Sequence, residues 1–152
     1  MSVFEDTLKL ALAEANIPFD DAMVSQCRAY FDSVVTVNEH LNLTRITDEA
    51  QAAKAHFADA MLLTNYIDLP QGCRVLDVGT GAGFPGVPLK LLRPDIDMML
   101  LDAAGKKTEF VKSSLSSLGV EAAVACGRAE ELARTKLRGS FDVVVSRAVA
   151  SL

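Results

Sequence analysis

The stretch Asp77-Val78-Gly79-Thr80-Gly81-Ala82-Gly83-Phe84-Pro85-Gly86 decides the fold of this 152-residue chain. The apolar run before it, residues 73–78, is typical of a buried strand, and the apolar run after it, residues 87–92, is typical of a helix. The glycines between them permit positive φ and carry no Cβ, so the backbone can turn sharply and a ligand can lie against it. The stretch therefore predicts a strand, a ligand-binding glycine turn and a helix.

Two classes of cofactor use a glycine turn of this kind. Gly81-Ala82-Gly83-Phe84-Pro85-Gly86 matches the G-x-G-x-x-G pattern of dinucleotide-binding proteins, in which free helix N–H groups bind a pyrophosphate. Asp77, however, stands two residues before the first glycine, and Pro85 removes one N–H near the helix start. This pattern suits the ammonium group of S-adenosylmethionine better than a pyrophosphate. We therefore expect S-adenosylmethionine as the cofactor, with a nicotinamide cofactor as the alternative.

The composition is typical of a cytoplasmic protein with one domain and an attached segment. Half of the residues are hydrophobic, which suffices for one sizeable core. No stretch has the length of a membrane span, and the N-terminus lacks the basic and apolar regions of a signal peptide. The three cysteines are odd in number and have no CxxC spacing, which indicates a reducing compartment. With only two histidines besides, no metal site is expected.

The net charge of −5 is unevenly distributed along the chain. Residues 1–72 carry 4 basic and 11 acidic side chains, whereas residues 73–152 carry 11 basic and 9 acidic ones. The acidic total argues against indiscriminate nucleic-acid binding. The second part still has enough lysine and arginine for a local basic face, although scattered solvating charges would fit the pattern as well.

Residues 1–68 are expected to form a helical segment. Ser2-Val3-Phe4-Glu5 fits a capping box at the start of a first helix. After Asp20, apolar residues recur at intervals of three and four, which predicts a longer amphipathic helix. A third helix is expected between residues 47 and 66.

Two polar residues of the third expected helix, His56 and Asp59, are three positions apart. Residues at this spacing share one face of an α-helix. We expect them to form a hydrogen-bonded structural pair rather than a catalytic one.

The periodicity changes at residues 69–72, where a second unit, residues 69–152, is expected to begin. Its expected strands are residues 73–78, 97–102, 122–126 and 141–146, and its expected helices are residues 85–92, 105–118 and 129–135. Near-continuous apolar strands that alternate with helices predict an α/β fold, with a parallel sheet covered on both faces. Right-handed crossovers give the strand order 3-2-1-4, which is a Rossmann-like arrangement.

The ligand site is expected at the carboxyl ends of these strands, as in other open α/β sheets. Asp102 ends the second strand, where an acid can accept hydrogen bonds from both hydroxyls of an adenosine ribose. Residues 127–130 follow the third strand, and Ser146 and Arg147 end the fourth. The polar residues of all four strand ends therefore converge on one edge of the sheet.

Five elements occur in a recognisable order along the chain. They are Asn42-Leu43-Thr44, the glycine stretch with its Phe-Pro-Gly ending, Leu101-Asp102 with Gly105-Lys106-Lys107, Gly127-Arg128-Ala129-Glu130, and Ser146-Arg147-Ala148. Together they resemble the bacterial RsmG (GidB) family, which methylates N7 of a guanosine in 16S ribosomal RNA. The resemblance covers nearly the whole chain. It departs from the family at Val37, where a tryptophan is usual.

The resemblance implies an enzyme, an S-adenosylmethionine-dependent rRNA (guanine-N7)-methyltransferase with 16S ribosomal RNA or the small-subunit ribonucleoprotein as its partner. The residues and the resemblance together indicate a cofactor site made of Asp77, Gly79, Thr80, Gly81, Gly83, Phe84, Asp102, Arg128, Ala129, Glu130 and Arg147. The expected RNA-binding residues are Lys106, Lys107 and Arg147. No catalytic base is assigned, because guanine N7 already presents an unprotonated lone pair.

Relatives of this family continue beyond the position of Leu152, so the C-terminal part of the family fold is expected to be missing. The fourth strand would then be an exposed apolar edge, and such edges tend to pair with another chain. Two alternative functions stay open at this point: a Rossmann-like enzyme that acts on a small molecule, and a non-catalytic cofactor-binding fragment.

Overall fold

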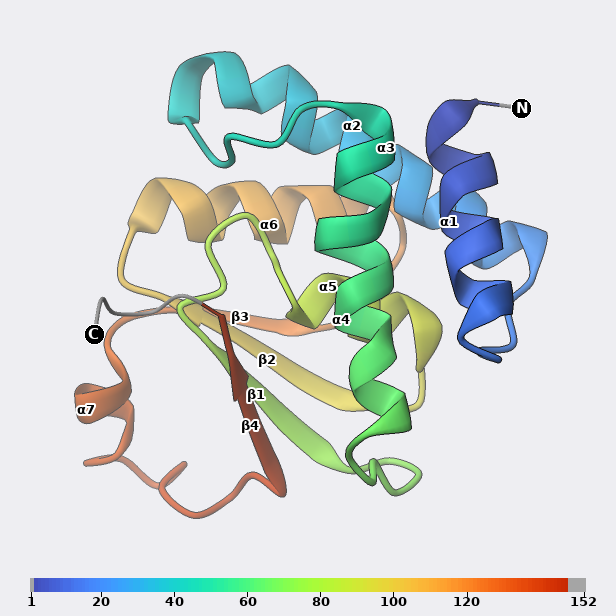
Figure 1. The fold of residues 1–152 in the computed structure, drawn as a ribbon. Coiled ribbons are helices and arrows are strands. Elements are labelled where there is room, and N and C mark those ends of the chain that lie inside the picture. Colours follow the sequence, from blue (N-terminus) through green and yellow to red (C-terminus); the bar gives the residue numbers. More distant parts are fainter. Residues whose placement is uncertain (1, 148–152) are drawn as a thin grey trace.

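The computed structural model describes residues 2–147 (Figure 1). Its first helix is capped as the sequence predicts. The Ser2 hydroxyl oxygen accepts a hydrogen bond from the N–H of Glu5 at 3.2 Å, and α1 spans Val3–Glu14. The side chains that α1 buries recur every four residues: Phe4, Leu8 and Leu12. The expected first helix is confirmed.

The second helix, α2 (Asp21–Leu41), is also capped by its own sequence. A carboxylate oxygen of Asp20 accepts a hydrogen bond from the N–H of Met23 at 2.8 Å. At the other end Asn42 adopts a left-handed conformation with φ of 49°, which stops the helix. The chain then enters the loop that carries Leu43 and Thr44.

The third expected helix is present, but it is not a uniform α-helix. It consists of α3 (Glu49–Ala52), the π-helix η1 (Ala53–Ala58), α4 (Asp59–Leu62) and the 3-10 turn η2 (Leu63–Asn65). Hydrogen bonds from i to i+5 widen the π-helical turn, so residues three apart no longer share a face there.

This widening explains why the expected pair of His56 with Asp59 is wrong. Nε2 of His56 lies 2.8 Å from Oγ1 of Thr44, and Nδ1 of His56 has no hydrogen-bond partner among the described residues. The histidine is thus joined to the loop after α2 instead of to its own helix.

A parallel four-stranded sheet forms the second part of the chain, in the order β3-β2-β1-β4. The strands are β1 (Arg74–Val78), β2 (Asp97–Asp102), β3 (Ala123–Cys126) and β4 (Val143–Ser146). This confirms the predicted Rossmann-like order, and the strands differ from the expected bounds by at most two residues. Asp77 pairs in register with Leu100 of β2 and Val145 of β4, so it lies in the middle of the sheet.

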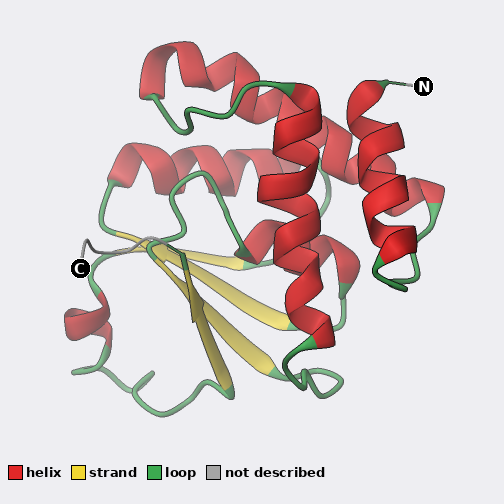
Figure 2. Cartoon of the chain, viewed as in Figure 1, coloured by secondary structure: helices red, strands yellow, loops and turns green. Residues whose placement is uncertain are grey.

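Helices cover the two faces of the sheet unequally (Figure 2). On one face α5 (Gly86–Leu92) and α6 (Gly105–Ser117) pack on the strands, and α2 packs on both of these helices. The other face is accompanied by the short helix α7 (Ala129–Leu132) and the turns after it, which together with the sheet line an apolar cavity of about 190 Å³. Helices therefore cover both faces of the sheet as expected, but the layer of α5 and α6 is substantial and that of α7 is thin.

Buried residues of the helical segment and of the sheet belong to one core. Within this core, Phe84 of the glycine loop contacts aromatic side chains of the helical segment. The ring centroid of Phe84 lies 6.0 Å from that of Tyr30 in α2 and 5.3 Å from that of Phe57 in η1. The helical segment is thus packed directly against the loop, and the division of the chain at residue 69 stays a prediction.

Candidate functional site

The glycine loop follows β1, and its glycines have different tasks. Gly79, Gly81 and Gly83 all have positive φ, at 69°, 58° and 101°. A Cβ on Gly83 would collide with the hydroxyl of Tyr30, so this glycine makes room for a neighbouring side chain. A Cβ on Gly81 would meet no atom within 4 Å, so this glycine faces open space. A ligand can therefore approach the loop at Gly81.

The side chain of Asp77 accepts two hydrogen bonds from the glycine loop and the start of α5. Its Oδ2 accepts hydrogen bonds from the hydroxyl of Thr80 at 2.7 Å and from the N–H of Gly86 at 2.8 Å. Asp77 is fully buried, and burial raises its pKa to about 7, although the hydrogen bonds from Thr80 and Gly86 act in the opposite direction. Its Oδ1 has no hydrogen-bond partner in the described part of the chain.

A cavity of about 610 Å³ opens at the carboxyl ends of the strands. The residues of the predicted site that line it are Gly79, Thr80, Gly81, Phe84, Asp102, Lys107, Arg128, Ala129, Glu130 and Arg147. Asp77, Gly83 and Lys106 do not line it. A direct contact of Asp77 with a ligand stays a prediction, whereas its bonds to the loop are present in the structure.

Asp102 connects the end of β2 to the glycine loop. Its Oδ2 accepts a hydrogen bond from the N–H of Gly81 at 2.8 Å, and its Oδ1 accepts one from the N–H of Ala104 at 2.9 Å. Each carboxylate oxygen has a further lone pair, and Asp102 lines the cavity. The acid is therefore held in place by the backbone and can still accept hydrogen bonds from a diol.

A second wall of the cavity comes from the helical segment, and sequence reasoning did not assign it to the site. Leu43, Thr44 and His56 line the cavity together with the strand ends. The imidazole of His56 stacks on the ring of Phe84, with centroids 4.4 Å apart and an interplanar angle of 5°. The motif Asn42-Leu43-Thr44 was a signal for the first two residues, but nothing in the sequence indicated a π-helix that turns His56 toward them.

Burial lowers the pKa of His56 to about 4, and the positive charge of Arg147 acts in the same direction. His56 is therefore neutral at physiological pH. Arg147 itself lies over the ring of Phe84, with its guanidinium carbon 5.5 Å from the centroid, and its Nη1 donates to the carbonyl of Ala55 at 3.2 Å. These contacts place Arg147 beside His56 at the end of β4.

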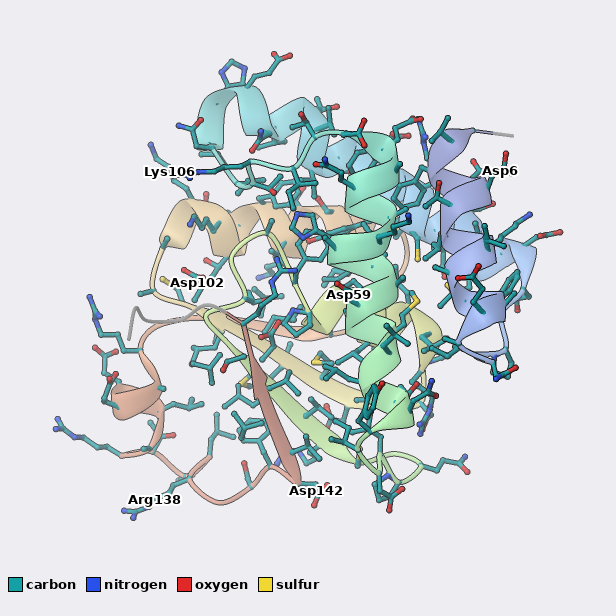
Figure 3. The ribbon with its side chains drawn as sticks, in the orientation of Figure 1. Asp6, Asp59, Asp102, Lys106, Arg138 and Asp142 are labelled. Atoms are coloured by element: carbon teal, nitrogen blue, oxygen red, sulfur yellow. The ribbon has the colours of Figure 1, made fainter. Side chains whose placement is uncertain are left out.

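The two candidate RNA-binding lysines differ in position. Lys107 is half-buried and lines the cavity, whereas Lys106 is exposed. Figure 3 labels Lys106 between the first turn of α6 and the loop after α2, and Asp102 close to the end of β2. Arg147 lies in the cavity, but Ala148, the last residue of the motif that contains it, is outside the described residues.

Within residues 2–147, no group of three or more His, Cys, Asp or Glu side chains could hold a metal ion. No helix in the same range combines the length and the apolar character that crossing a membrane requires.

Comparison with known proteins points to one family. Residues 23–152 match the model of the family GidB, described as rRNA small subunit methyltransferase G. Two relatives carry the name ribosomal RNA small subunit methyltransferase G and are each 39% identical to this chain, one from Clostridium novyi and one from Pelotomaculum thermopropionicum. The matches cover 99% and 100% of this chain but 63% and 64% of the relatives. The chain thus spans a little under two thirds of their length.

Two solved structures share the fold. One is a protein-L-isoaspartate O-methyltransferase with a TM-score of 0.60 and 14% identity, which matches over 93% of this chain and 47% of its own length. The other is a putative protein-L-isoaspartate O-methyltransferase from Plasmodium falciparum in complex with S-adenosyl-L-homocysteine. Its TM-score is 0.57 and its identity 14%, over 96% of this chain and 73% of its own length. At this identity the likeness concerns the fold alone.

Proposed function

We propose that the cavity binds S-adenosylmethionine for methyl transfer to 16S ribosomal RNA. The premise is that this chain belongs to the GidB family of rRNA small subunit methyltransferase G. The observation that carries this proposal is the junction of Asp102 with Gly81 at 2.8 Å inside the cavity. It joins an acid that can accept a ribose diol to the open turn of the glycine loop. The family model covers both residues.

The strand order supports one direction of the cofactor across the cavity. With Asp102 at the end of β2 as the ribose acceptor, we expect residues 128–130 after β3 to hold the adenine. The methionine part then extends the other way, toward the glycine loop after β1 and Arg147 at the end of β4. The reactive methyl group would therefore be presented where Phe84, His56 and Arg147 line the cavity.

The surroundings of the glycine loop suit a cofactor that carries no phosphate. When bound, S-adenosylmethionine supplies a methyl group on a sulfonium. The N–H of Gly86, a donor that a pyrophosphate would need, is already bonded to Asp77, which argues against a nicotinamide dinucleotide. His56 is neutral because its pKa is lowered to about 4, so it does not repel a sulfonium.

The acceptor is proposed to be guanine N7, forming 7-methylguanosine. N7 carries a lone pair at neutral pH, so no residue has to remove a proton from it. The chain's part is to align N7 with the methyl carbon, and positioning of this kind can supply a large share of a rate enhancement. A single-turnover rate that is flat between mildly acidic and mildly basic pH is the corresponding expectation.

Calorimetry with S-adenosylhomocysteine tests the cofactor site. Asp102→Ala is expected to weaken binding by about 1–3 kcal/mol, the scale for a lost hydrogen bond to a charged group. Asp97→Ala is the matched control, because Asp97 begins the same strand at the opposite edge of the sheet and its side chain is 63% exposed. Equal losses in the two variants, or tighter binding of a nicotinamide dinucleotide, would refute the proposed cofactor.

Methyl transfer is then measured with small-subunit particles, with naked 16S ribosomal RNA and with no RNA. Transfer that depends on RNA supports the proposed substrate, whereas transfer to small molecules alone would contradict it. Cofactor binding without any transfer would favour a cofactor-binding fragment, an alternative that the partial coverage of the relatives keeps relevant. In that case a version extended to the relatives' length is the decisive comparison.

Two further parts of the proposal concern the cell and assembly. A ribosomal RNA substrate implies a cytoplasmic location.

Val144 on β4 is 60% exposed, and β4 is an outer strand of the described sheet. We propose that this edge allows self-association, which sedimentation of the wild type beside Val144→Lys would detect as a lower apparent mass for the variant.

A further inference from the structure

Thr44 is fixed within the cavity wall by three hydrogen bonds. Its N–H donates to Oδ1 of Asn38 at 2.9 Å, and its Oγ1 accepts from the N–H of Ile46 at 3.0 Å. The same Oγ1 lies 2.8 Å from Nε2 of His56. Thr44 is half-buried and lines the cavity, as does His56. The hydroxyl therefore has a defined place at the surface of the cavity.

The surroundings of His56 decide which of its nitrogens carries the proton. The side chain is 5% exposed, and Nδ1 has no hydrogen-bond partner among the described residues. A proton on Nδ1 would be a buried donor without an acceptor, and such orphaned N–H groups are rarer in proteins than under-satisfied acceptors. The proton therefore belongs on Nε2, from which it is donated to Oγ1 of Thr44.

This tautomer leaves the hydroxyl proton of Thr44 available. A hydroxyl has two acceptor lone pairs and one O–H donor. One lone pair takes the N–H of Ile46 and the other takes Nε2–H of His56. The O–H of Thr44 then has no acceptor among residues 2–147, and because Thr44 lines the cavity, we infer that a ligand there can accept it.

The chemistry of purines indicates what such a donor would recognise. On the edge that carries N7, guanine presents two neighbouring acceptors, N7 and O6, whereas adenine presents N7 and an amino donor. A fixed O–H beside the methyl group matches O6 while N7 faces the methyl carbon. The amino group of adenine would leave this donor unpaired, which is costly in a buried site.

We propose that the hydroxyl of Thr44 selects guanine by donating to O6, and that His56 is the positioning residue that keeps this hydroxyl a donor. The inference rests on the proposed function, because it takes the direction of the cofactor from Asp102 and the acceptor atom from guanine N7. It adds to that function a residue that discriminates between the two purines.

The test uses the whole chain saturated with S-adenosylhomocysteine and four nucleotide probes. Guanosine and inosine monophosphate both carry O6, whereas adenosine and 2-aminopurine riboside monophosphate lack it. We expect the first two to bind at least about tenfold more tightly than the last two, the scale of one hydrogen bond. Thr44→Val, which keeps the shape of the side chain, should remove this preference. Thr47→Val is the matched control, since Thr47 is exposed on the same loop.

Nitrogen NMR of His56 in the wild type provides a readout that a purely structural role would not move. The proton is expected on Nε2, and the signals should shift with guanosine monophosphate but not with adenosine monophosphate. A proton on Nδ1, equal binding of the four probes, or an equal loss for all probes in Thr44→Val overturns the inference. Absence of S-adenosylhomocysteine binding in the wild type would instead refute the proposed function, so the two failures are distinguishable.

Discussion

The hydroxyl of Tyr30 donates a hydrogen bond of 2.5 Å to the carbonyl oxygen of Ala82, although 52 positions separate the two residues. Tyr30 belongs to α2 and Ala82 to the glycine loop. Tyr30 is fully buried, and burial raises the pKa of its hydroxyl far above the ordinary value, so it stays a neutral donor. The helical segment is thus hydrogen-bonded to the glycine loop at a defined atom.

Tyr30→Phe is expected to reduce both stability and cofactor affinity. The variant leaves the carbonyl of Ala82 buried without its donor, which should cost about 1–3 kcal/mol in the free energy of unfolding. Urea denaturation and calorimetry with S-adenosylhomocysteine measure the two effects. The other tyrosine of the chain provides the control: Tyr66 is 82% exposed, and Tyr66→Phe should change neither quantity. An unchanged affinity in Tyr30→Phe would show that the loop does not depend on this bond.

Gly81→Ala is expected to interfere with the ligand as well as with the backbone. The left-handed φ of 58° makes any side chain unfavourable at this position, by about 1–2 kcal/mol. Gly119 offers a matched comparison, because its φ is 69° and a Cβ there also meets no atom within 4 Å. Both alanine variants should lose similar stability, but only Gly81→Ala should lose affinity for S-adenosylhomocysteine. Equal affinities would place the ligand away from Gly81.

Asp77 should make the stability of the protein depend on pH. Its pKa is raised from the ordinary 3.8 to about 7, mainly by burial. A raised folded-state pKa means that the folded protein binds the proton more tightly than the unfolded chain. This contribution is fully present below the unfolded pKa and is lost as pH rises through the folded one, with a total of up to about 4 kcal/mol.

Urea denaturation at several pH values, for the wild type and Asp77→Asn, measures this loss. The wild type should lose stability relative to the variant as pH rises toward about 7 and little more beyond it. His56 has the opposite sign, because its pKa is lowered to about 4, and it removes stability as the solution becomes acidic. Both proteins contain His56, so its effect cancels in the comparison. Parallel curves would show that Asp77 does not titrate in this range.

Lys106→Glu is expected to weaken RNA binding without affecting the cofactor, because Lys106 is exposed and does not line the cavity. If Lys106 neutralises one phosphate, the slope of log affinity against log salt should fall by about 1. Lys107→Glu should affect RNA and cofactor together, since Lys107 lines the cavity. Lys112→Glu, an exposed change farther along α6, is the control. Identical salt slopes in wild type and Lys106→Glu would make this lysine ordinary solvated surface.

The sequence was a reliable guide to the fold where local signals agreed with one another. The caps at Ser2 and Asp20 and the apolar strands predicted the elements, and right-handed crossovers predicted their order. Element ends were less accurate in the last part, where α7 stops at Leu132 instead of residue 135. No apolar periodicity marks that end.

The site was predictable along the strand ends and less so elsewhere. Asp102 ends a strand and residues 128–130 follow one, so topology alone brings them together. Thr44 and His56 reach the cavity through tertiary packing and a π-helical turn, and neither leaves a periodic signal. The side-chain direction of Asp77 was missed for a related reason: a motif shows that an acid is present but not which way its side chain points.

The bond between Asp77 and the N–H of Gly86 also bears on protein engineering. Here the amide at the start of α5 is occupied by the chain's own carboxylate, in the interior of the fold. A redesign toward dinucleotides would therefore have to begin with Asp77 and the close packing around Gly86. It would remove the hydrogen bonds by which Asp77 holds the glycine loop.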